Sequence, residues 1–160
     1  MIPLPIPLLL AVLAALAPVM AMVSERVLGF APCTLCLWQR WPYWVAMVLA
    51  LLAAAWPRGR RGLLALAGIA VLASGAIAAL HVGVEQGWWP SPLASCTAPV
   101  STGGGTIDDL LASMAVRPDK PCDAAAYPIP YLPLSFAAMN LIYALALGGF
   151  TLICLRRRPA

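Results

Sequence analysis

The chain has 160 residues, of which 62% are hydrophobic and only 10% charged, and its mean hydropathy is +0.89. This composition excludes an ordinary water-soluble domain, in which about a quarter of the residues are charged. The formal net charge of +4 does not indicate nucleic-acid binding, because the arginines gather beside apolar segments.

Four apolar stretches are each long enough to cross a bilayer, which takes roughly 20 helical residues. They cover about residues 2–23, 35–56, 63–84 and 134–155. The first lacks the positively charged start of a signal peptide, so we expect it to be retained. The sequence therefore predicts one all-α membrane domain over 1–160, a four-transmembrane-helix bundle with a long polar loop over 85–133. Within that loop, residues 106–114 are predicted to form a short amphipathic helix on the membrane surface.

Two clusters of arginines set the predicted orientation. Arg58, Arg60 and Arg61 lie between the second and third stretches, and residues 156–158 follow the fourth. With four spans both clusters fall on the same side of the membrane. Basic residues gather on the cytoplasmic side of membrane proteins, so we expect both termini in the cytoplasm. The long loop then faces the opposite side, which in a bacterium is the periplasm.

A C-x-x-C motif, Cys33 to Cys36, lies where the second apolar stretch begins. Such a pair can close a small reactive disulfide, and a helix N-terminus stabilises a thiolate in its first turn, which favours Cys36. Arg40 follows four residues later and shares a helix face with Cys36. A guanidinium near a membrane surface is costly without a role. We expect Arg40 to stabilise the Cys36 thiolate and to donate hydrogen bonds to a bound acceptor, with a headgroup anchor as the alternative.

Pro42 interrupts the predicted second helix close to this motif. Proline lacks a backbone N–H and clashes with the preceding turn, so we expect a kink or an irregular turn over residues 38–41.

Three further cysteines lie downstream. Cys96 and Cys122 are in the long loop, so the chain holds two separable cysteine pairs. The two pairs, Cys33 with Cys36 and Cys96 with Cys122, are both expected to face the periplasm, where disulfides persist. Cys154 lies near the other end of the fourth stretch and is expected to be a buried small hydrophobic residue.

Other uses of a C-x-x-C motif fit the sequence less well. Covalent haem attachment requires His directly after the second cysteine, and Leu37 stands there. A zinc site needs four ligands, and Cys96 and Cys122 are single distant residues without the paired spacing of such sites, so we predict no metal. Structural disulfides on an inert four-helix scaffold remain an alternative.

Several motifs occur together along nearly the whole chain. Besides the four apolar stretches they are Pro32-Cys33-Thr34-Leu35-Cys36 with Arg40, Pro90-Ser91-Pro92-Leu93-Ala94-Ser95-Cys96, Pro121-Cys122-Asp123 and Pro133-Leu134-Ser135. In this combination the chain resembles the disulfide bond formation protein B (DsbB) family of bacterial inner-membrane thiol:quinone oxidoreductases. It departs from the family at Pro42 and at residues 124–126, which bear on the pocket shape and on the packing of the loop.

The resemblance implies a path for electrons. Cys96 would form a mixed disulfide with a periplasmic thioredoxin-like oxidase of the DsbA type, and Cys122 would pass the electrons on by attacking Cys33. Cys36 would then react, as a thiolate, with ubiquinone or menaquinone held near Arg40. The implied function is reoxidation of the DsbA-type partner with electron transfer to membrane quinone, which supports disulfide bond formation.

His81 is the only histidine of the chain and lies near the outer end of the third stretch. It is a candidate to hydrogen-bond the quinone or to relay protons, and a histidine that merely satisfies its own hydrogen bonds is the alternative. Two other functions stay open. One is a thiol reductase of the vitamin K epoxide reductase type, although that family usually carries its C-x-x-C in a late helix. The other is the non-enzymatic scaffold, which predicts no turnover of a reduced partner with quinone.

Overall fold

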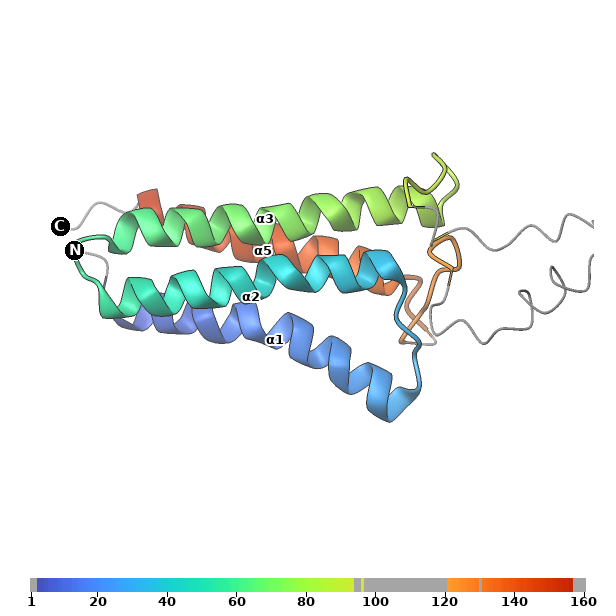
Figure 1. Cartoon of the computed structure of the whole chain (residues 1–160), viewed down its shortest axis with the longest axis horizontal. Coiled ribbons are helices and arrows are strands. Elements are labelled where there is room, and N and C mark those ends of the chain that lie inside the picture. The colour runs from blue at the N-terminus through green and yellow to red at the C-terminus, as the bar shows by residue number, and fades with distance from the viewer. Residues whose placement is uncertain (1–2, 94–95, 97–120, 130, 157–160) are drawn as a thin grey trace, which may run out of the picture.

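The computed structural model describes residues 3–93, 96, 121–129 and 131–156 of the chain. These residues contain four long apolar helices, α1 (Pro5–Leu28), α2 (Thr34–Ala55), α3 (Arg60–Glu85) and α5 (Phe136–Arg156), which lie side by side (Figure 1). Each is long and apolar enough to cross a membrane, because 21 residues or more span about 30 Å. The predicted all-α membrane fold with four spans is confirmed. The amphipathic helix expected over 106–114 lies outside the described residues.

The ends of the helices differ from those expected. α1 continues past residue 23 to Leu28 and so includes Glu25 and Arg26. It stops where Gly29 takes a left-handed backbone conformation, with φ of 70°, which ends many helices. Hydropathy locates the apolar part of a helix, but glutamate and arginine are good helix formers that extend it.

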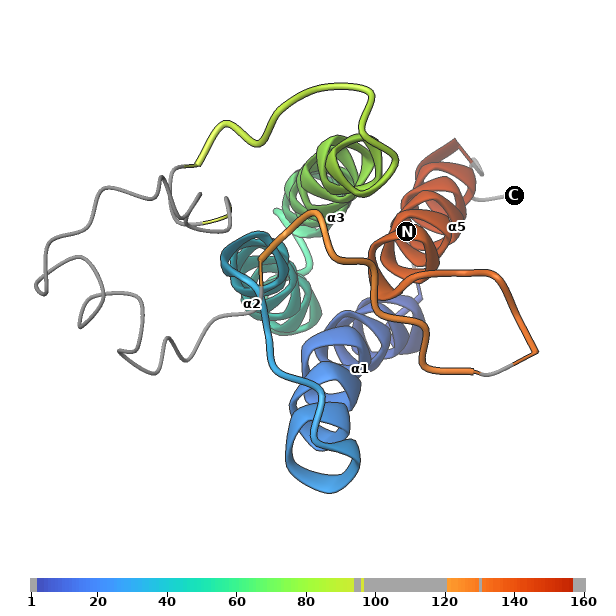
Figure 2. The ribbon, with the colours of Figure 1, turned by 90° about the vertical axis from the view of Figure 1, so that its right-hand side faces the viewer.

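Pro42 does not interrupt α2. The helix is continuous from Thr34 to Ala55, so the irregular turn expected over residues 38–41 was wrong. Membrane helices tolerate proline when neighbouring groups satisfy the freed backbone. The change of direction occurs instead in α1, which contains Pro18. Seen from the end of the bundle, the C-terminal part of α1 leans away from the other helices (Figure 2).

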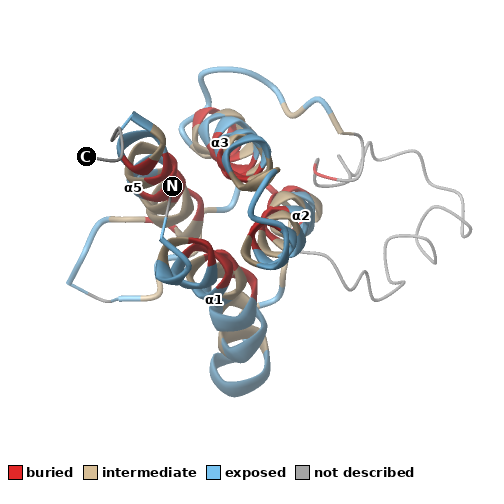
Figure 3. Cartoon of the chain, turned by 90° about the vertical axis from the view of Figure 1, so that its left-hand side faces the viewer, coloured by how far each residue is buried: buried red, intermediate tan, exposed pale blue. Residues whose placement is uncertain are grey.

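Small residues allow the helices to approach closely. α2 packs against α1 and α3, and α3 also packs against α5, whereas α1 and α5 touch little. The fully buried core is rich in alanine: Ala14, Ala46, Ala50, Ala53, Ala67, Ala78 and Ala144. Close packing of small side chains is what holds helices together in a lipid environment. Buried faces point inward and exposed faces outward (Figure 3).

The two ends of the bundle differ in chemistry. At one end, where α2 gives way to α3, Arg60 Nε donates to the carbonyl oxygen of Ala53 at 3.0 Å and Arg61 Nη2 to that of Leu155 at 2.6 Å. These arginines satisfy carbonyls near the C-termini of α2 and α5, where a positive charge is also favourable. At the other end, α2 begins, α3 ends, and residues 121–129 and 131–135 lead to the start of α5. That end holds the candidate site.

The contact between α3 and α5 gives a stability prediction. A Cβ atom at Gly75 would lie 3.0 Å from Cβ of Ala144, whereas one at Gly149 would meet nothing within 4 Å. We expect Gly75→Leu to lower the free energy of unfolding by about 1–3 kcal/mol, because the larger side chain forces the helices apart. Gly149→Leu is the matched control and should change it little. Unfolding in mixed micelles followed by circular dichroism measures both, and equal effects would contradict a tight α3–α5 contact at Gly75.

Candidate functional site

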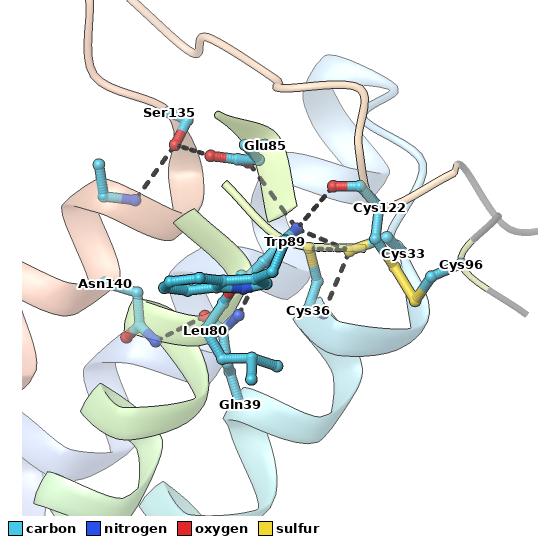
Figure 4. A network of polar contacts seen from close by, with 12 residues as sticks. Cys33, Cys36, Gln39, Leu80, Glu85, Trp89, Cys96, Cys122, Ser135 and Asn140 are labelled. Atoms are coloured by element: carbon cyan, nitrogen blue, oxygen red, sulfur yellow. Dashed lines mark hydrogen bonds and ion pairs between the residues drawn. A yellow bond between two sulfur atoms is a disulfide. The ribbon is translucent and has the colours of Figure 1, made fainter. Parts of the chain in front are cut away.

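Four cysteines meet at one end of the bundle. Cys33 directly precedes α2 and Cys36 lies in its first turn, while Cys96 and Cys122 come from the segments that follow α3. Cys33, Cys96 and Cys122 belong to one buried cluster, and Cys36 packs against it. Figure 4 shows the four side chains together at the start of α2. The structure thus brings together all four cysteines singled out from the sequence.

The two cysteine pairs are in different redox states. Cys96 and Cys122 form a disulfide, whereas Cys33 and Cys36 are free. The Sγ atoms of Cys33 and Cys36 lie only 2.6 Å apart. Little movement therefore separates this free pair from a closed disulfide. We call Cys33 and Cys36 the inner pair, and Cys96 and Cys122 the outer pair.

Cys33 is the N-cap residue of α2, just outside the membrane-spanning part of that helix. Its Sγ accepts a hydrogen bond from the backbone N–H of Cys36 at 3.2 Å and lies 3.5 Å from Nε2 of His81. The neighbouring Cys36 thiol and, to a smaller extent, His81 lower the pKa of Cys33 from 9.0 to about 5, although burial acts against them. From the sequence we expected the helix N-terminus to stabilise Cys36; Cys33 is stabilised too, because its Sγ accepts from a backbone N–H of the first turn.

A cavity of about 500 Å³ opens beside the inner pair. Its walls come mainly from α1, the first turns of α2 and the start of α5, where the bend of α1 leaves room between the helices. Most of the lining is apolar, and the polar side chains that reach it include Gln39, Arg40, Glu85, Asn140 and Tyr143. An apolar cavity with a few convergent polar groups is typical of a small-molecule site.

Arg40 reaches this cavity while paired with Glu25 of α1. Both terminal nitrogens of the guanidinium donate to the Glu25 carboxylate. This two-point contact neutralises the charge of Arg40 in apolar surroundings and ties α2 to α1. Arg40 Nε is buried and has no hydrogen-bond partner among the described residues. A buried N–H without a partner is costly, so it suits an acceptor atom of a bound ligand.

His81 is fully enclosed, with 2% of its surface exposed. Its Nε2 lies 3.5 Å from Cys33 Sγ, 3.2 Å from the carbonyl oxygen of Cys122 and 3.8 Å from Glu85 Oε1. Its Nδ1 lies 2.9 Å from Nε2 of Gln39. These contacts put His81 at the junction between the inner pair and the outer disulfide.

The inner pair and His81 also form a set of potential metal ligands. The Sγ atoms of Cys33 and Cys36 and a ring nitrogen of His81 lie within 4.8 Å of one another. Two sulfurs and an imidazole suit a soft metal ion. The four-cysteine zinc site considered from the sequence is not formed, because Cys96 and Cys122 are bonded to each other.

Sequence reasoning overlooked several polar residues of the site. Gln39 was not singled out among the tryptophans beside it, yet only 6% of it is exposed. Ser74, Asn140 and Glu25 were not singled out as site residues either. Polar side chains inside apolar spans are rare and often functional, which is the signal that could have found them. Cys154 is buried in α5, as expected.

Comparison with known proteins agrees with the arrangement of helices and cysteines. The family model described as disulfide bond formation protein DsbB matches residues 4–154, a range that includes both cysteine pairs and reaches into all four long helices. Searches of curated proteins and of solved structures gave no match. Because the family model covers nearly the whole chain, the protein belongs to the DsbB family.

Proposed function

We propose that this protein reoxidises a thioredoxin-like thiol oxidase of the DsbA type and passes the electrons to membrane quinone. One observation carries the proposal: a disulfide and a free cysteine pair share a buried cluster beside a largely apolar cavity. Proteins of the DsbB family are generally thiol:quinone oxidoreductases. Since DsbA-type proteins are strong oxidants, their reoxidation needs an acceptor of higher potential, and a quinone meets that need.

The proposed electron path uses the outer pair first. A thiolate of the reduced partner attacks Cys96 and releases Cys122, which attacks Cys33 of the oxidised inner pair and frees Cys36. The partner's second thiolate attacks the partner sulfur bonded to Cys96, so the partner leaves with a disulfide and Cys96 is freed as a thiolate. Attack of Cys96 on Cys122 then breaks the Cys122–Cys33 bond, re-forms the outer disulfide and leaves the inner pair reduced. The described structure corresponds to this last state. Two electrons and two protons leave the partner, and the same number reach the acceptor.

Ubiquinone or menaquinone would supply a two-electron, two-proton acceptor when bound. The cavity fits such a group in size and polarity, because pockets for small molecules range over about 300–1,000 Å³ and are mostly apolar. Arg40 would hold a carbonyl oxygen through its unpartnered Nε–H, and Glu25 would keep the guanidinium in place. Cys36, the more exposed cysteine of the inner pair, lines the same cavity.

His81 is proposed to serve the exchange between the two pairs. Its ring lies within reach of Cys33 Sγ and of the Cys122 carbonyl, and it also lines the cavity. It can therefore hold or move a proton at Cys33 while charge develops on that sulfur.

The proposed orientation puts the arginine-rich end of the bundle, with both termini, in the cytoplasm. The cysteines would then face the periplasm, where the DsbA-type partner is oxidised. The arginines at the ends of α2 and α5 support this assignment through the usual excess of positive charge on the cytoplasmic side.

The direct test is oxidation of a reduced DsbA-type protein by the purified protein in detergent. The proposal expects turnover that requires added quinone and yields one quinol per partner disulfide. Absence of turnover with intact disulfides would favour a stapled, non-enzymatic scaffold.

Replacement of Cys36 separates the two half-reactions. Because Cys36 lies on the acceptor side, we expect Cys36→Ser to abolish quinone reduction while Cys96 still captures the partner. Stopped-flow absorbance follows the quinone, and non-reducing gels follow the captured partner. Normal quinone reduction by this variant would remove Cys36 from the path.

Replacement of Cys122 tests the order of the outer pair. Without Cys122 the mixed disulfide between Cys96 and the partner has no internal thiol to resolve it. We expect Cys122→Ser to accumulate this complex with a partner that lacks its own resolving cysteine, as seen by mass spectrometry. A complex through Cys33 instead would reverse the proposed order.

Arg40 is tested by two substitutions. Arg40→Lys keeps the charge but loses the planar donor set, and Arg40→Ala loses both. We expect the KM for quinone to rise in both variants, more in Arg40→Ala, by roughly 10- to 150-fold for the loss of a hydrogen bond worth about 1.5–3 kcal/mol. Steady-state kinetics with varied quinone measures the change. Unchanged KM in both folded variants would reduce Arg40 to an anchor paired with Glu25.

A further inference from the structure

A continuous set of hydrogen bonds crosses the buried core between α2, α3 and α5. Ser74 Oγ donates to the backbone carbonyl of Gln39 at 2.7 Å. Asn140 Nδ2 lies 3.3 Å from Ser74 Oγ and 2.7 Å from Gln39 Oε1, and the Tyr43 hydroxyl donates to Asn140 Oδ1 at 2.8 Å. At the far end, Gln39 Nε2 lies 2.9 Å from His81 Nδ1.

One fixed acceptor determines the direction of every hydrogen bond in this set. The backbone carbonyl of Gln39 can only accept, so the single hydroxyl proton of Ser74 is committed to it. Ser74 Oγ must therefore accept from the Asn140 atom that faces it, and that atom has to be the amide nitrogen. The same nitrogen faces the Gln39 side chain, so Gln39 presents its oxygen to Asn140 and its nitrogen to His81.

The directions of these hydrogen bonds allow only one neutral tautomer of the His81 imidazole. Because the Gln39 amide nitrogen can only donate, Nδ1 of His81 must accept, and the ring proton sits on Nε2. Nε2 is the nitrogen that faces Cys33 Sγ and the carbonyl oxygen of Cys122. Glu85 is the other ionisable group at that nitrogen, at 3.8 Å.

We propose that Gln39, held in place by Ser74 and Asn140, is a positioning residue that fixes His81 in the Nε2–H form. This inference rests on the proposed function and deepens it. The fixed N–H points at the two groups that must meet during exchange, the sulfur of Cys33 and the backbone of Cys122. It stabilises negative charge on Cys33 when that sulfur leaves Cys122, and it holds the Cys122 segment against the membrane-embedded helices.

The tautomer can be measured directly, because His81 is the only histidine in the chain. Nuclear magnetic resonance of the purified protein with ¹⁵N-labelled histidine distinguishes a protonated from an unprotonated ring nitrogen. We expect the Nε2–H form in both redox states of the inner pair. Gln39→Met keeps the length of the side chain but loses its donor. The Cys122 carbonyl then remains the acceptor that favours Nε2–H, so a share of the Nδ1–H form should appear beside it when the inner pair is oxidised and Cys33 carries no charge. Tyr43→Phe is the matched control, because it leaves the Ser74 anchor intact and should keep Nε2–H alone.

Kinetics provide the second measurement. Loss of the fixed N–H should lower kcat for partner oxidation by Gln39→Met about tenfold, as expected for one lost hydrogen bond, with KM for quinone unchanged. A wild-type protein with the proton on Nδ1 would overturn the inference, as would a folded Gln39→Met protein that keeps Nε2–H alone. If Gln39→Met does not fold, the wild-type spectrum and Ser74→Ala, which removes only the anchor, still decide the matter. Since the spectra need neither partner nor quinone, an inactive protein with Nε2–H would refute the proposed function and leave this inference standing.

Discussion

The contact between the His81 ring and the carbonyl oxygen of Cys122, 3.2 Å long, joins the loop that carries the outer disulfide to helices built to lie in a membrane. The same nitrogen lies 3.5 Å from Cys33, so one buried side chain touches both cysteine pairs. A histidine in such a place requires partners for both ring nitrogens, because an unsatisfied polar group in an apolar core is costly. Gln39 meets that requirement at Nδ1 and the Cys122 carbonyl meets it at Nε2, while Ser74 of α3 and Asn140 of α5 hold Gln39 of α2 in place.

The bend of α1 is the second constraint on the site. The C-terminal part of α1 diverges from the bundle (Figure 2), and α1 and α5 touch little, which leaves the cavity beside the inner pair. The ion pair between Arg40 and Glu25 bridges α2 and the diverging part of α1. It stabilises a charge that would otherwise be unfavourable there, and it holds the guanidinium at the edge of the cavity with one N–H unpartnered in the described structure. Stability and the proposed acceptor site thus depend on the same contact.

Much of this architecture follows from local properties of the sequence. The apolar stretches predicted the four helices because the length of a span is set by the bilayer, and the motif around Cys33 predicted a reactive pair at a helix start. The C-terminal end of α1 was missed because polar residues such as Glu25 continue a helix beyond its apolar part. The irregular turn expected at Pro42 was wrong, because α2 stays helical through the proline, which membrane helices tolerate.

The network that holds His81 could not be predicted from one sequence. Gln39 lies among tryptophans and looks like a surface residue until the rotation of α2 about its axis is known. Asn140 donates to Gln39 only because α5 and α2 have a particular offset along their helix axes. Such long-range register depends on side-chain packing across several helices. The cysteine motifs, in contrast, can be recognised from the spacing of their residues in the sequence alone.

The central claim is that electrons leave the inner pair for a quinone, and a single turnover tests it most directly. Protein with the inner pair reduced and the outer pair oxidised, the state described here, is mixed anaerobically with one equivalent of quinone. The account predicts one quinol per chain and a new disulfide between Cys33 and Cys36, identified by mass spectrometry, with the outer disulfide unchanged. Failure to form quinol, or its formation without a disulfide between Cys33 and Cys36, would contradict the account.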